Sequence, residues 1–135
     1  MPHTAIRLLF AIAGVYDFVI GIAFLVAGPR IFDAAGVPHP NHWGYIQFGA
    51  LLLIIFGLMF FAVAYDPVAN RNLIPYGMLL KVSYTALVAY YWVRGECPTL
   101  FKPFAIIDAV MFVLFLLAYM PSRRAGVAPS AFVQK

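Results

Sequence analysis

Short polar segments rich in proline and glycine divide the chain into four long apolar stretches. These stretches cover residues 8–27, 44–65, 73–93 and 104–119. A helix needs about 20 mostly apolar residues to cross a bilayer, with about 17 as the lower limit, so the fourth stretch is slightly short unless residues 101–103 extend it. The pattern predicts an all-α bundle of four transmembrane helices over residues 1–120, with a short polar C-terminal tail over 121–135.

Proline marks the ends of the predicted helices. Gly28-Pro29 is expected to end the first helix, because proline removes a backbone donor and clashes with the preceding turn. Asp66-Pro67 is expected to close the second helix, and Lys102-Pro103 to open the fourth. The connection over residues 29–43 is then the longest in the chain.

Composition agrees with a membrane protein. Hydrophobic residues make up 64% of the chain and charged residues 10%, whereas a soluble domain carries about 25% charged residues. Arg7 before an apolar core resembles a secretory signal, but no small-residue cleavage site ends that core, so we interpret it as the first membrane helix. The single cysteine, Cys97, argues against an internal disulfide. The net charge of +4 is scattered over loops and ends rather than gathered in a patch, so nucleic acid is not an expected partner.

The basic residues predict an orientation in the membrane. Four spans place both termini on one side, together with Arg7, Arg71, Arg123, Arg124 and Lys135. The opposite side holds Arg30, Arg94 and Lys102. Because positively charged flanks favour the cytoplasm, both termini are expected to be cytoplasmic.

Three ionisable residues interrupt the apolar stretches: Asp17, Lys81 and Asp108. Gly14, Gly21 and Gly28 recur every seven residues and share one face of the first helix, which would let another helix approach closely. Asp17 follows Gly14 by three residues, so it is expected to lie on the same face, inside the bundle. Helix two contributes only Gln47, near its end.

The same three residues lie at similar depths. A rise of about 1.5 Å per residue puts Asp17, Lys81 and Asp108 roughly 15, 12 and 16 Å from the side of the termini. A lone charge at the bilayer centre costs about 3 kcal/mol on insertion scales, which favours pairing. We therefore predict one shared polar cluster, in which a protonated carboxyl would remove the excess negative charge. It could hold the helices in register, or transfer a proton or contact a lipid or quinone headgroup; alternatively, one residue extends to the interface instead.

The first loop offers a weaker candidate for a metal site. His39 and His42 form an HxxH pair, and Asp33, Glu96 and Cys97 are expected on the same side of the membrane. Imidazole, thiolate and carboxylate groups are transition-metal ligands. The alternative is that both histidines are ordinary interfacial residues.

Several of these features together resemble a known family. They are Asp17, the DPVANR turn (66–71), Gly77 with Lys81, and Asp108 followed by AVMFVLF. This combination resembles the small four-span bacterial membrane proteins grouped as DoxX-like, and more distantly the four-span lipid isomerases of the EXPERA type, which use membrane-buried carboxylates. The DoxX-like resemblance implies a bacterial inner-membrane location and a role as a small subunit or accessory protein of a membrane oxidoreductase.

Two functions are therefore expected from the sequence. The first is an accessory or assembly subunit of a larger membrane complex, for example a redox complex, in contact with membrane lipids and with other subunits or further copies of itself. The alternative is a membrane-embedded enzyme or carrier for a lipid- or quinone-like molecule, in which Asp17 or Asp108 transfers a proton and Lys81 tunes it. The sequence indicates no particular cofactor.

Overall fold

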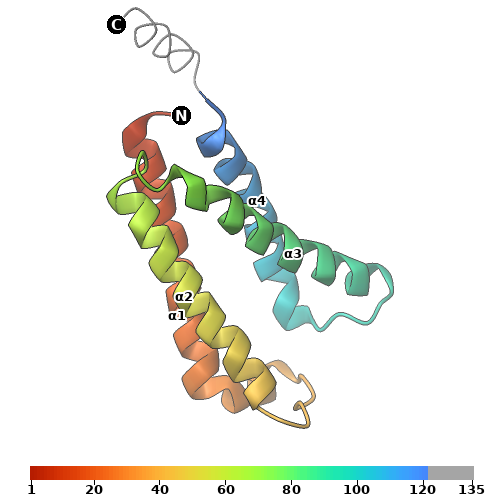
Figure 1. Ribbon diagram of the computed structural model, residues 1–135. Helices are drawn as coiled ribbons and strands as arrows, with labels where there is room; N and C mark the ends of the chain where they lie inside the picture. The colour runs from red at the N-terminus through yellow and green to blue at the C-terminus, as the bar shows by residue number, and fades with distance from the viewer. Residues whose placement is uncertain (122–135) are drawn as a thin grey trace, which may run out of the picture.

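Four helices make up the computed structural model, which describes residues 1–121 (Figure 1). They are α1 (His3–Ala35), α2 (Gly44–Tyr65), α3 (Ile74–Val93) and α4 (Lys102–Tyr119), with single-turn 3₁₀ helices η1 (Arg71–Leu73) before α3 and η2 (Thr99–Phe101) before α4. No strand occurs in the described residues, so the predicted all-α fold is confirmed. By length and composition all four helices are able to cross a membrane, which indicates an integral membrane protein. The predicted tail, including Arg123, Arg124 and Lys135, lies outside the described residues from position 122 onward.

The first helix is longer than predicted. Gly28-Pro29 does not end α1, which continues to Ala35 with a kink at Ala27, where φ is −125° and ψ is 22°. Pro29 directly follows the kink, in effect at the first turn of a second helical segment, where a missing amide donor costs little. The helix ends at Gly36, whose left-handed φ of 67° suits glycine. A proline signal that predicts the end of a helix can therefore mark a kink instead.

The helices are arranged as two antiparallel hairpins, α1 with α2 and α3 with α4 (Figure 1). The N-terminus, the α2–α3 connection and the end of α4 lie together, and we call this side the terminal end. The α1–α2 and α3–α4 connections lie at the opposite side, the loop end, toward which the two hairpins diverge. The expectation that both ends of the four-helix segment lie on one side is confirmed.

An aromatic core joins the hairpins near the terminal end. The ring centroids of Phe10 in α1 and Phe115 in α4 are 4.5 Å apart, and those of Phe60 in α2 and Phe115 are 5.2 Å apart. All three rings are fully buried, and Val63 and Ile74 pack with them. Such packing involves only part of each helix, and toward the loop end the two hairpins diverge (Figure 1).

Glycines bring α1 and α2 into backbone contact. A Cβ atom added at Gly57 would lie 2.9 Å from the Gly14 carbonyl oxygen and 3.0 Å from the Phe18 amide nitrogen. Gly21 meets α2 in the same way, at the Ala50 carbonyl, so the glycine face predicted for the first helix packs against α2. Small residues at such crossings allow close van der Waals packing in a membrane.

Gly57→Ala is expected to destabilise the α1–α2 hairpin. The new methyl group would meet backbone atoms that cannot rotate away, an overpacking that costs about 1–3 kcal/mol. Gly49→Ala in the same helix is the matched control, because an added Cβ there has no atom within 4 Å and the gain in helix propensity is the same. The free energy of unfolding in detergent measures the difference; equal values for the two variants would contradict the predicted contact.

Candidate functional site

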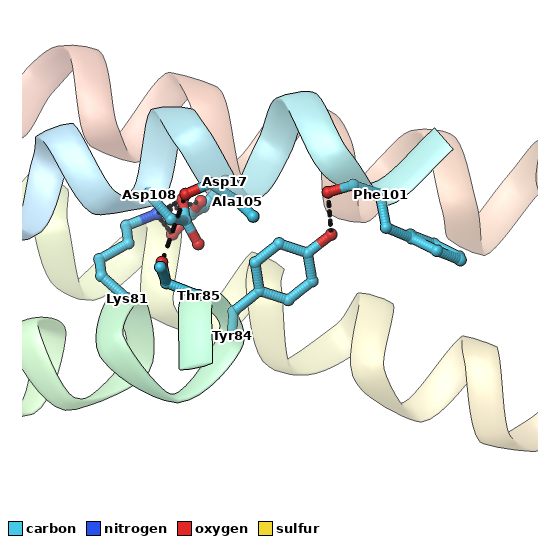
Figure 2. A network of polar contacts seen from close by, with 7 residues as sticks. All are labelled: Asp17, Lys81, Tyr84, Thr85, Phe101, Ala105 and Asp108. Carbon is cyan, nitrogen blue, oxygen red and sulfur yellow. Dashed lines mark hydrogen bonds and ion pairs between the residues drawn. The ribbon is translucent and has the colours of Figure 1, made fainter. Parts of the chain in front are cut away.

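The three charged residues from the apolar stretches meet inside the bundle (Figure 2). The Lys81 Nζ atom donates to Asp17 Oδ1 at 2.8 Å, to Asp17 Oδ2 at 3.1 Å and to Asp108 Oδ1 at 3.0 Å. The side chains of Lys81, Asp17 and Asp108 are 1%, 2% and 10% exposed. The predicted juxtaposition is confirmed, and none of the three turns outward to lipid.

Aromatic rings complete the surroundings of the ammonium group. The Lys81 Nζ atom lies 5.2 Å from the ring centroid of Tyr16 and 5.6 Å from that of Phe60, within the range of cation–π attraction. Gly77, one turn before Lys81 in α3, leaves room for Phe60, since a Cβ at Gly77 would lie 2.5 Å from the Phe60 ring. The position of Lys81 is therefore fixed by carboxylates and by rings.

Lys81 also makes the polar connection between the hairpins. Its bonds to Asp17 are the only side-chain hydrogen bonds that join helices of different hairpins in residues 1–121. The neighbouring polar contacts stay within the second hairpin: Tyr84 donates to the Phe101 carbonyl at 3.1 Å, and Thr85 to the Ala105 carbonyl at 3.4 Å (Figure 2). Polar bonds between helices are worth more in a membrane than apolar contact alone, because lipid chains compete only for the latter.

One carboxylate oxygen of the cluster accepts no hydrogen bond from the described residues. The three N–H groups of Lys81 are used by Asp17 and by Asp108 Oδ1. Asp108 Oδ2 has no hydrogen bond to any described residue, and Asp108 is the most exposed member of the cluster. With all three groups ionised, two carboxylates and one ammonium leave one excess negative charge.

A cavity adjoins this cluster between the hairpins. Its volume is about 350 Å³, and it extends toward the loop end as far as Tyr45, whose side chain is on the surface (70% exposed). Asp17 and Asp108 are the only charged residues that line it within the described part of the chain. The remaining lining residues are mostly aliphatic and aromatic and come from η2 and all four helices: Tyr16, Ile20, Phe24, Tyr45, Ile46, Gly49, Ala50, Leu52, Leu53, Leu80, Tyr84, Phe101 and Phe104.

Sequence reasoning missed Tyr16 as a residue of the site. Its hydroxyl group is buried and has no hydrogen-bond partner in residues 1–121, whereas the Tyr84 hydroxyl, in the same cavity wall, is bonded to Phe101. A buried polar group without a partner costs about 1–3 kcal/mol. Tyr16 stands next to Asp17 in the sequence, but nothing in the apolar pattern separates it from a tyrosine that faces lipid.

The loop histidines take part in local contacts. His39 Nε2 lies 2.6 Å from Asp33 Oδ1, and His42 Nδ1 accepts a hydrogen bond from the Gly44 amide at 2.9 Å. Among the described residues, no three histidine, cysteine, aspartate or glutamate side chains come together as a possible metal site. The metal interpretation of His39 and His42 gains no support. Gln47 is exposed and has no part in the charged cluster.

Comparison with protein-family models, curated proteins and solved structures found no match. The DoxX-like resemblance therefore stays a prediction from the sequence.

Lys81→Met is expected to destabilise the fold by about 3–5 kcal/mol, because two buried carboxylates lose their only cation. The control is Lys102→Met, whose ammonium lies over the Trp92 ring and forms no ion pair in the described chain. The triple variant Asp17→Asn, Lys81→Met, Asp108→Asn removes the uncompensated charge and is expected to recover much of the loss. Unfolding in detergent measures all three; a mild effect of Lys81→Met alone would show that the cluster does not stabilise the bundle.

Proposed function

We propose that the protein binds a lipid- or quinone-like molecule between its two hairpins and that Asp108 exchanges a proton with the headgroup of that molecule. The observation that carries this proposal is a carboxylate with a free oxygen, Asp108, in the wall of a mostly apolar cavity inside a membrane helix bundle. This favours the enzyme-or-carrier alternative of the sequence analysis.

The cavity has the character of a site for an amphipathic molecule. Small-molecule sites enclose about 300–1,000 Å³ and combine an apolar wall with a few polar groups, and the volume of about 350 Å³ lies within that range. Leu53, Phe104 and their neighbours would contact the apolar tail. Asp108 would meet the headgroup, so the molecule would be oriented by a single polar end.

The cluster suits Asp108, rather than Asp17, to gain and lose a proton. Both oxygens of Asp17 accept hydrogen bonds from Lys81, whereas Asp108 uses one. When Asp108 is protonated, Asp17 and Lys81 remain as a neutral pair and the hairpins stay connected. In the transfer, an O–H bond of the headgroup breaks, one forms on Asp108 Oδ2, and the negative charge moves to the headgroup; the reverse step restores both. Proton exchange by a positioned carboxyl is ordinary general acid–base chemistry.

Leu53→Trp is expected to remove the bound molecule by filling the cavity. Leu53 lines the cavity, whereas Leu51 of the same helix does not and is exposed on the bundle surface, so Leu51→Trp is the matched control. Native mass spectrometry of the gently solubilised protein should show a bound lipid-like species that Leu53→Trp loses and Leu51→Trp retains. The same species on both variants would place it on the outer surface and contradict the proposal.

Asp108→Asn is expected to abolish proton exchange and leave the protein folded, since the Asp17–Lys81 pair remains. Adding the molecule identified above should change the carboxylic acid carbonyl band in infrared difference spectra of the wild type. That change should be absent in Asp108→Asn and present in Asp33→Asn, which removes an exposed carboxylate of α1. A band that survives in Asp108→Asn would assign the proton to another group.

The accessory-subunit role, the bacterial inner-membrane location and the cytoplasmic termini also stay proposals. Of the basic residues that predict cytoplasmic termini, Arg7 and Arg71 lie at the terminal end, where they donate to the carbonyls of Ala64 and Tyr119. The mass spectrum described above also reports co-purifying subunits or a second copy of the chain. Stoichiometric partner chains on a protein without a bound lipid would favour the accessory role.

A further inference from the structure

We infer that the bound molecule is uncharged and that its headgroup carries one hydroxyl group, which donates a hydrogen bond to the free oxygen of Asp108. This inference rests on the proposed function and names its ligand class. It separates hydroxylated amphiphiles, such as phenols and quinols, from anionic lipids and from ethers or esters.

The cavity offers no free positive charge to a negative headgroup. No lysine, arginine or histidine lines it within the described chain, and the nearby ammonium of Lys81 already gives its three N–H groups to Asp17 and Asp108. A phosphate or carboxylate would therefore lie beside two carboxylates without a counter-charge. Charge repulsion is strong where water is excluded, and an unpaired charge is costly to bury.

The free oxygen of Asp108 favours a headgroup that can donate a hydrogen bond. Asp108 Oδ2 is the one oxygen of the cluster without a hydrogen bond to the described chain. A headgroup with an O–H group satisfies it with a charge-assisted hydrogen bond, roughly twice as strong as a neutral one, whereas an ether or ester oxygen cannot donate.

The number of hydrogen-bond donors on the headgroup also affects how well it fits the cavity. An ammonium headgroup carries several N–H donors and would lose its hydration in the cavity, where Asp108 Oδ2 is the only carboxylate oxygen left free. A hydroxyl group needs only one acceptor. The geometry therefore favours a neutral single donor over a cation, although both would be attracted by the excess negative charge.

Four probes with the same nonylphenyl tail test this directly: nonylphenol, its methyl ether nonylanisole, the anion nonylbenzoate and the cation nonylbenzylammonium. Dissociation constants are measured by calorimetry on the full chain in nanodiscs of neutral lipid. The wild type should bind nonylphenol about tenfold more tightly than nonylanisole, the ratio expected for one hydrogen bond to a charged group. Nonylbenzoate and nonylbenzylammonium should bind at least tenfold more weakly than nonylphenol. Equal binding of the phenol and the ether, or tighter binding of either ion, would overturn the inference.

Two Asp→Asn variants test whether Asp108 causes the preference for the phenol over the ether. Asp108→Asn removes the free carboxylate oxygen, so the ratio between the phenol and the ether should fall to about one. Asp33→Asn changes the net charge equally but alters an exposed carboxylate of α1 that does not line the cavity, so the preference for the phenol should remain. Loss of the preference in both variants would assign it to net charge and overturn the role of the Asp108 oxygen.

The Leu53→Trp variant distinguishes failure of the hydroxyl preference from failure of binding in the cavity. If Leu53→Trp weakens all probes and the wild type does not distinguish phenol from ether, the cavity binds amphiphiles but the hydroxyl inference is wrong. If Leu53→Trp leaves every probe unaffected, the cavity is not the binding site and the proposed function itself fails.

Discussion

The sharing of one ammonium group between two carboxylates holds this structure in its present form. Lys81 in α3 pairs with Asp108 in α4, within its own hairpin, and with Asp17 in α1, across to the other. In a bilayer, lipid chains replace apolar helix contacts at little cost, but they cannot replace an ion pair, because separating the charges would expose them to hydrocarbon. The bond between Asp17 and Lys81, together with the aromatic core around Phe115, therefore sets how the two hairpins sit relative to each other.

The cavity follows from that bond and from where the close packing stops. Glycine contacts such as Gly14 with Gly57 keep α1 and α2 together, and the aromatic core around Phe115 joins the hairpins at the terminal end. Beyond the charged cluster the hairpins diverge toward the loop end, and side chains of all four helices line the space between them. A largely apolar cavity next to a buried carboxylate arises here from the angle between two hairpins rather than from a separate domain.

The sequence was informative where the bilayer imposes a large cost. Charges in apolar stretches must pair, so the types and depths of Asp17, Lys81 and Asp108 were enough to predict that they meet. The number of spans followed from the length of the apolar stretches, and the glycine face of α1 from the seven-residue spacing of its glycines. The cavity did not follow, because Leu53 in its wall and Leu51 on the bundle surface look alike in an apolar sequence pattern. The kink at Ala27 was missed for a local reason: Pro29 is compatible with the end of one helix and with the first turn of the next.

The charge count sets Asp108 apart from the other two members of the cluster. Asp17 and Lys81 alone would form a neutral pair that connects the hairpins. Asp108 adds no further connection between them, because it lies in the same hairpin as Lys81, and in its ionised form it brings an uncompensated negative charge into the membrane. A purely structural cluster would be more stable with an amide or an apolar side chain there, since the excess charge is unfavourable in a dry interior. Asp108 lines the cavity, and its Oδ2 atom has no hydrogen bond to the described chain, which is what the proposed proton exchange requires.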